Sequence, residues 1–222
     1  MPHTIGCAKK FDGLVYSPKL SRCAGRTLGA NMTIIRTDAT PEIVINALTL
    51  GFSADPFMRW LYPQPHDYLL HFPSTLKLFG GVAFDNETAL CAENGRAAAL
   101  WLPPETHPDG GGLMELFQAT LSKDVLNDAF KVFEKMDQIH PDEPCWHLAF
   151  VEADPSMRGK GYGSALIEHL LPRCDAEGKI AYLENTNPAN TSFYQRHGFR
   201  VIGEIQAGRA PPMVAMQRDP RT

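Results

Sequence analysis

Glycine occupies every second position of a six-residue segment that also contains two basic residues, Arg158-Gly159-Lys160-Gly161-Tyr162-Gly163. An apolar run over residues 146–151 precedes this segment, and residues 164–171 follow it with helical periodicity. The order predicts a strand, a tight glycine turn and the N-terminus of a helix. The N–H groups of such a turn converge on one point, where the helix dipole adds partial positive charge. The segment therefore predicts a pyrophosphate cradle, with Arg158 and Lys160 supplying formal charge.

The glycine spacing excludes the two better-known phosphate motifs. A P-loop requires Gly, four residues and then Gly-Lys-Ser/Thr, a string that the sequence lacks. A dinucleotide fingerprint would require glycine at positions 159, 161 and 164, but position 164 is Ser164. A nucleotide-binding enzyme of either kind is therefore disfavoured.

The six residues resemble Arg/Gln-x-x-Gly-x-Gly/Ala, the coenzyme A loop of the GNAT superfamily of N-acetyltransferases. Downstream, residues 187–199 resemble the Asn-Pro-x-Asn-x-x-Phe-Tyr-x-x-x-Gly-Phe signature that follows the fifth strand in many of these enzymes. By element order the resemblance covers residues 32–222, and it is sharpest over residues 146–199. Two stretches, residues 52–60 and 99–105, are similar to the puromycin N-acetyltransferase-like branch.

The resemblance implies an α/β fold with a mixed, mostly antiparallel sheet of six to seven strands, flanked by helices and splayed between strands four and five. It implies acetyl-CoA as the cofactor. The backbone of Val151, Glu152 and Ala153 would hold the pantetheine arm at the splay. The pyrophosphate would be held by the glycine segment and the residue after it: Arg158, Gly159, Lys160, Gly161, Tyr162, Gly163 and Ser164.

Catalytic candidates come from the same comparison. Tyr194 matches the tyrosine that faces the coenzyme sulfur, and a phenol with a pKa near 10 can donate a proton to a thiolate at neutral pH. Asn187 and Asn190 compete for the pantetheine contact, and Asn190 is preferred. For a general base the sequence offers Glu152 and Glu184, with Glu184 preferred through the resemblance; many such sites need no dedicated base.

The acceptor is expected to be a small amine, such as an aminonucleoside, an amino acid or a polyamine. Phe57, Trp60 and Trp101 are expected to wall its pocket, together with Phe52 and Tyr62. Aromatic residues at such spacings are also common in cores, so the assignment depends on where the fold places them.

Composition indicates a globular protein. Hydrophobic residues make up 44% of the 222 residues, charged residues 21%, and the net charge is −4. The charge does not favour nucleic-acid binding, and no apolar run is long enough for a membrane span. The five cysteines include no Cys-x-x-Cys pair, which indicates reduced thiols in a cytoplasmic protein. We expect no metal, and a monomer or homodimer.

Residues 1–31 are basic and rich in small residues, without the apolar core of a secretory signal. They are expected to be a poorly ordered extension, with a transit-like segment as the alternative. Residues 32–222 are expected to form one acetyltransferase domain. Within it the pattern predicts strands at 32–36, 88–91, 97–102, 146–151, 180–184, 200–205 and 213–217. Helices are predicted from Pro41 and over 67–79, 113–121, 125–139 and 164–171, with Gly110 to Gly112 as a flexible joint.

Taken together, the sequence favours an acetyl-CoA-dependent N-acetyltransferase that acts by direct attack in a ternary complex. The alternative is a non-catalytic acyl-CoA sensor or interaction module, which would keep the glycine loop without the chemistry.

Overall fold

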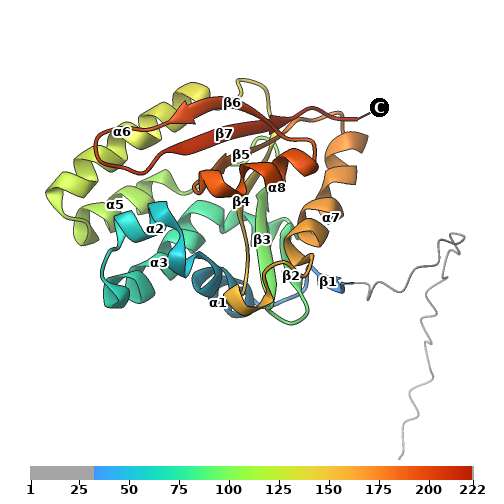
Figure 1. Ribbon diagram of the computed structural model, residues 1–222, viewed down its shortest axis with the longest axis horizontal. Coiled ribbons are helices and arrows are strands. Elements are labelled where there is room, and N and C mark those ends of the chain that lie inside the picture. The colour runs from blue at the N-terminus through green and yellow to red at the C-terminus, as the bar shows by residue number, and fades with distance from the viewer. Residues whose placement is uncertain (1–32, 222) are drawn as a thin grey trace, which may run out of the picture. The chain divides into compact units, whose positions relative to one another are not determined.

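The protein is described by a computed structural model over residues 33–221, in which the strands form one sheet of order β1-β2-β3-β4-β5-β7-β6 (Figure 1). Only β4 and β5 pair in parallel within these residues. The fold class predicted from the sequence is confirmed. The strands are β1 Ile35–Arg36, β2 Ala89–Ala92, β3 Ala97–Leu102, β4 Trp146–Ala153, β5 Ala181–Asn185, β6 Arg200–Ile205 and β7 Met213–Arg218.

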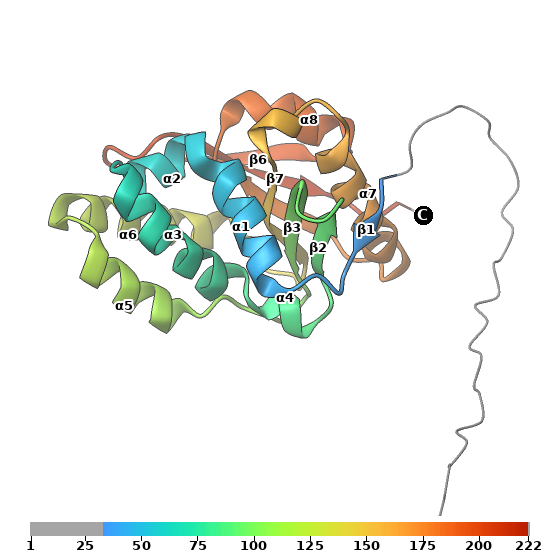
Figure 2. The same ribbon diagram turned by 90° about the horizontal axis from the view of Figure 1, so that it is seen from below.

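Helices cover both faces of the sheet (Figure 2). α1, α3 and α6 pack against one face around a core that includes Leu48, Phe72 and Phe150. α7 and α8 pack against the other face, around a second core that includes Trp146 and Leu166. The helices are α1 Pro41–Gly51, α2 Pro56–Leu61, α3 Pro65–Gly80, α4 Val82–Asp85, α5 Gly110–Thr120, α6 Lys123–Ile139, α7 Tyr162–Ala176 and α8 Thr191–Arg196. Across the described residues, no helix combines the length and the apolar character that a membrane crossing requires.

The sheet opens between β4 and β5. These strands pair only at Trp146 with Ala181 and at His147 with Tyr182, although both continue further. On the other side of β4, Trp101 of β3 pairs with Leu148, whereas the preceding Leu100 pairs with Phe150. The residue between them is therefore an extra one in β4, a bulge that bends the strand away from its neighbour. The predicted splay is confirmed.

Polar side chains cap the N-termini of several helices. Asp55 caps α2 by accepting hydrogen bonds of 3.0 Å from the N–H groups of Phe57 and Met58. Gly110, expected to begin a flexible joint, instead begins α5, because Asp109 caps that helix through a 2.9 Å bond from Gly112 N–H. The prediction of a flexible joint at Gly110 to Gly112 is therefore wrong. A strong cap offsets the poor helix propensity of three consecutive glycines.

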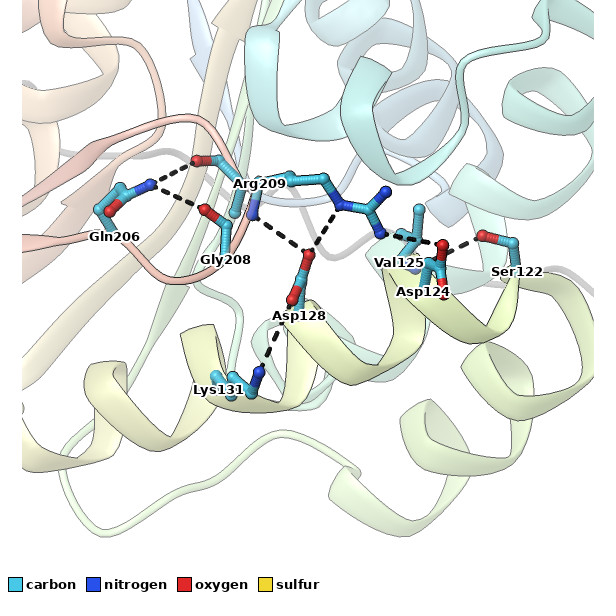
Figure 3. Close-up of polar contacts among 9 residues, drawn as sticks. Ser122, Asp124, Val125, Asp128, Lys131, Gln206, Gly208 and Arg209 are labelled. Carbon is cyan, nitrogen blue, oxygen red and sulfur yellow. Dashed lines mark hydrogen bonds and ion pairs between the residues drawn. The ribbon is translucent and has the colours of Figure 1, made fainter.

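α6 is fixed to the turn between β6 and β7 by one carboxylate (Figure 3). Asp128 Oδ2 accepts from the N–H and from Nε of Arg209, at 3.1 and 3.2 Å. Lys131 Nζ lies 3.8 Å from the other oxygen. The contact holds the helix whose C-terminal half borders the cavities described below.

The hairpin of β2 and β3 turns at Asn94 and Gly95 as predicted, and both residues have positive φ. The basic extension predicted for residues 1–31 lies outside the described residues.

Candidate active site

A cavity of about 420 Å³ lies where the diphosphate cradle was predicted. Val151, Glu152 and Ala153 of β4 line one part of it, and the N-terminus of α7 lines another. The remaining lining comes from Ala54, Asp55, Met157, Arg158, Gly159, Gly161, Tyr162, Gly163, Ser164, Asn187, Asn190, Phe193, Tyr194 and Arg196. We call it the coenzyme cavity. Of the residues predicted to bind coenzyme, Lys160 alone does not line this cavity.

The glycine turn leaves the N-terminus of α7 open. Gly161 is the N-cap residue, with φ of 87°, and no side chain caps the helix. Gly159 also has a positive φ, of 75°, and a Cβ built on either glycine would meet no atom within 4 Å. The first N–H groups of a helix have no partner inside it. This turn therefore combines free donors, space and helix-dipole charge, and it fits a pyrophosphate.

Arg158 lies beside this turn and is held by two oxygens. Its Nη2 donates to the carbonyl of Gly51 at 2.7 Å and lies 3.4 Å from Glu152 Oε2. Burial raises the pKa of Glu152, although the positive charge of Arg158 opposes that shift. The guanidinium remains 48% exposed, so it can also reach an anion in the cavity.

Tyr194 lies at the inner end of the coenzyme cavity, where α8 meets the splay. The residue is 8% exposed. Burial raises the pKa of its phenol well above the usual value, and the negative charges of Glu152 and Asp55 add to the shift. The hydroxyl therefore stays protonated at neutral pH and can act as a proton donor.

A smaller cavity, of about 30 Å³, occupies the splay itself. It shares five lining residues with the coenzyme cavity: Asp55, Val151, Glu152, Asn190 and Tyr194. It also reaches Glu184 on β5, which lines a small apolar cavity of about 50 Å³ and a large outer cavity of about 480 Å³. The shared lining residues make these cavities neighbours, in a row that crosses the sheet where β4 and β5 separate.

Glu184 faces His147 across the splay. His147 Nε2 donates to Glu184 Oε2 at 2.7 Å, and the two side chains are 10% and 8% exposed. Burial alone would raise the pKa of Glu184, but the charge and hydrogen bond of His147 outweigh it and lower the pKa. Tyr182 and His140 pack beside the pair. The sequence suggested Glu184 as a candidate base, but its pairing with His147 depends on the register of two parallel strands.

The outer cavity lies between the end of α6 and the loops that flank β3 and β4. Its lining combines acidic, histidine and apolar side chains: Phe79, Glu105, Thr106, His107, Pro108, Phe133, Met136, Asp137, His140, Pro141, Asp142, Glu143, Pro144, Cys145, His147 and Glu184. Cys145 is 5% exposed, and burial raises its pKa to about 11, so it remains a thiol.

The aromatic residues predicted to wall the acceptor pocket separate in the fold. Phe57 lines the small apolar cavity. Trp60 packs on Phe57 with ring centroids 5.5 Å apart, and Trp101 is completely buried in the second core beneath α7. Neither tryptophan lines any of the four cavities, so both are removed from the candidate site.

Asp55 is a site residue that the sequence reading missed. Its carboxylate borders both the coenzyme cavity and the splay. Oδ2 accepts from Thr186 at 2.6 Å while Oδ1 caps α2. Burial raises its pKa despite these bonds. The Asp-Pro pair was a recognisable helix-cap signal, but nothing local to it indicated proximity to Tyr194.

Comparison with known proteins gives an independent view of this region. Residues 129–199 match the model of the Acetyltransferase (GNAT) family. An uncharacterized N-acetyltransferase of Schizosaccharomyces pombe is 33% identical over 118 residues, which are 51% of this chain and 45% of that protein. The chain thus matches less than half of that relative's length. The peptidyl-lysine N-acetyltransferase YjaB of Salmonella typhimurium is 25% identical over 45% of this chain and 83% of its own.

A solved structure shows the same architecture. The crystal structure described as histone acetyltransferase HPA2 and related acetyltransferase, from Corynebacterium glutamicum, has a TM-score of 0.61 and 25% identity. The match covers 86% of this chain and 98% of that one. The chain therefore has the fold of the GNAT acetyltransferases, and residues 129–199 carry its match to that family.

Proposed function

We propose that the protein is an acetyl-CoA-dependent N-acetyltransferase that transfers the acetyl group to a small-molecule amine in a ternary complex. The observation that carries this proposal is the row of cavities through the splay. The coenzyme cavity lies at one end, the Glu184–His147 pair lies midway, and the outer cavity offers a separate site for the amine. The family match supports the acetyl donor and the reaction class.

Binding of the donor would use the groups already described. The N–H groups at Gly161 and the start of α7 would hold the diphosphate, with Arg158 beside it. Val151 to Ala153 would hold the pantetheine arm through their backbone, and Asn190 would contact it from the start of α8. Acetyl-CoA supplies the activated acetyl thioester.

The proposed step is a direct transfer. The amine nitrogen forms a bond to the acetyl carbon, and the carbon–sulfur bond breaks with its electron pair on sulfur. Tyr194 Oη gives its proton to that sulfur. The attacking nitrogen gives up one proton to the Glu184–His147 pair, whose 2.7 Å hydrogen bond lets the two side chains share it.

Calorimetric titration with acetyl-CoA, followed by thiol release across a panel of amines, tests the proposal. Gly161→Ala should weaken acetyl-CoA binding about tenfold, because a side chain at φ of 87° strains the turn by roughly 1–3 kcal/mol. Gly178→Ala, at φ of 62° just after the other end of α7, carries similar strain and should leave binding unchanged. Absent acetyl-CoA binding, or equal weakening by both variants, would refute the coenzyme site.

The finer branch assignment stays a prediction. The likeness of residues 52–60 to the puromycin N-acetyltransferase-like branch concerns α2, where Asp55 performs a capping role. Puromycin should therefore be included in the amine panel as one candidate acceptor among several.

A further inference from the structure

The outer cavity and the coenzyme cavity differ in charge. Within residues 33–221 the outer cavity is lined by no lysine or arginine, whereas the coenzyme cavity is lined by Arg158 and Arg196. The acidic side chains of the outer cavity are Glu105, Asp137, Asp142, Glu143 and Glu184. An anionic coenzyme and a cationic acceptor would each find a complementary cavity.

The end of α6 makes this negative charge stronger. α6 ends at Ile139, and its last turn contains no basic residue. The C-terminus of a helix carries partial negative charge, which cations stabilise and acids oppose. Here Asp137 lies in that last turn, and Asp142 and Glu143 follow within the next loop, all exposed. A positively charged ligand would relieve this unfavourable arrangement.

The opposite loop adds a strained acid. Glu105, after β3, has φ of 66°, in the left-handed region that a non-glycine residue seldom adopts. Strain of this kind is concentrated at ligand sites, where the surrounding structure maintains it. Glu105 is exposed and lines the same cavity as Asp142 and Glu143.

The buried carboxylate of Glu184 lies at the inner end of the outer cavity. The side chain of Glu184 is 8% exposed, and a 2.7 Å hydrogen bond joins its Oε2 to His147. A single cation at Glu184 would leave the exposed acids at the mouth of the outer cavity without a counter-charge. These acids are Glu105, Asp137, Asp142 and Glu143.

We propose that the acceptor is a diamine or polyamine, whose reacting amine lies at Glu184 while a second ammonium group is held by the acids at the mouth. This inference rests on the proposed function. A volume of about 480 Å³ falls within the range of small-molecule pockets, about 300–1,000 Å³, and accommodates a flexible aliphatic chain. Phe79, Phe133 and Met136 supply apolar surface for its methylene groups.

Matched amines test the charge requirement. Cadaverine carries a second ammonium group where hexylamine carries a methyl group, and aminocaproate carries a carboxylate. At saturating acetyl-CoA, thiol release should give kcat/KM for cadaverine about tenfold or more above hexylamine, with aminocaproate lowest. Added salt should reduce the cadaverine advantage, because the acids at the mouth are exposed to solvent. A hexylamine rate equal to that of cadaverine, or a lysine peptide preferred over every diamine, would overturn the proposal.

The residues are tested by the double variant Asp142→Asn/Glu143→Gln, which removes two exposed charges from the loop. It should raise KM for cadaverine about tenfold while leaving hexylamine unchanged. Glu134→Gln/Glu204→Gln makes the same charge change at exposed positions that do not line the cavity, and should leave both substrates unchanged. An equal effect on hexylamine, or an equal effect of the control pair, would contradict the assignment.

Binding without turnover separates the two proposals. Cadaverine should bind the protein in calorimetry even without acetyl-CoA, and the Asp142/Glu143 variant should weaken that binding. If cadaverine binds in this way but no amine releases thiol, the transferase proposal fails and the diamine site stands. If acetyl-CoA supports turnover of monoamines and cadaverine has no advantage in binding or rate, the diamine site fails and the transferase stands.

Discussion

At the scale of single residues, sequence motifs identified groups whose roles depend on local backbone, and missed those that depend on long-range register. Gly159 and Gly161 have positive φ because they form a local turn, and the spacing of the glycines was enough to predict that turn. The His147–Glu184 contact instead joins residues 37 apart in the chain and depends on the parallel pairing of β4 and β5. Trp101 was misplaced for a different reason: all six residues of β3 are buried, so the sequence pattern did not show which face of the sheet each side chain joins.

Tyr194→Phe should lower kcat about 10²-fold or more, with little change in acetyl-CoA affinity, because it removes only the proton donor. Tyr162→Phe is the matched control: this tyrosine lines the same cavity, but its hydroxyl bonds Arg96 at 3.2 Å. The pKa of Tyr194 is raised, so its protonated form persists to higher pH than an ordinary phenol. kcat should therefore show no alkaline loss between pH 7 and about 10 from this group. Full activity of the Tyr194 variant would eliminate it as the acid.

At the scale of elements, most strands and long helices were predictable, because their apolar periodicity is local. Helices whose start depends on a capping residue were harder to predict. Asp55 caps α2, and Asp109 caps α5. Connections between elements could not be predicted at all. Asp128 and Arg209 are 81 residues apart, and their contact is what holds α6 against the turn between β6 and β7 (Figure 3).

Gly208→Ala should destabilise the protein more than Gly178→Ala. Both glycines have positive φ, at 54° and 62°. A Cβ at Gly208 would overlap the carboxylate of Asp128, whereas one at Gly178 would meet nothing within 4 Å. The backbone strain common to both should cost about 1 kcal/mol, and the overlap about 1–3 kcal/mol more. Denaturant unfolding measures the difference, and equal losses would show that the turn can move away from α6 freely.

Asp175 connects α7 to the end of β7. Its two oxygens accept from Arg218 Nη1 and Nη2 at 2.7 and 2.8 Å, and the arginine side chain is 4% exposed. Asp175→Asn should cost about 3 kcal/mol in the free energy of unfolding, because it leaves a buried guanidinium uncompensated. Asp219→Asn, whose partner Arg200 is 3.6 Å away and exposed, should cost less than about 1 kcal/mol.

The pH dependence of that loss follows from the same contact. Hydrogen bonding to Arg218 lowers the pKa of Asp175 in the folded protein. A lowered pKa stabilises the fold above the unfolded value, near 3.9, and the stabilisation disappears as pH falls through the lower folded value. The difference in the free energy of unfolding between the original protein and Asp175→Asn should be complete at pH 7 and shrink below about pH 4. A difference in the free energy of unfolding that does not change with pH would mean that the charge of Asp175 is not its cause.

At the scale of the whole molecule, the splay divides the site into two approaches. The coenzyme cavity is bordered by the N-terminus of α7 and by α8, on one side of the opening. The outer cavity is bordered by the end of α6 and by the loops beside β3 and β4, and among the four cavities it shares no lining residue with the coenzyme cavity. Glu184 and Tyr194 both border the splay cavity between them, which explains how groups from separate elements could act on one reaction.

Two separate approaches predict that coenzyme and amine bind without excluding one another. Initial rates measured with both substrates varied should give intersecting double-reciprocal lines, the pattern of a ternary complex. Desulfo-CoA should compete with acetyl-CoA but not with the amine, because it would occupy only the coenzyme cavity. Parallel lines would instead indicate that the acetyl group is first transferred to the protein, for which the thiol of Cys145, with its pKa raised to about 11, is poorly suited. Competition between desulfo-CoA and the amine would place both in one cavity and contradict the division of the site by the sheet.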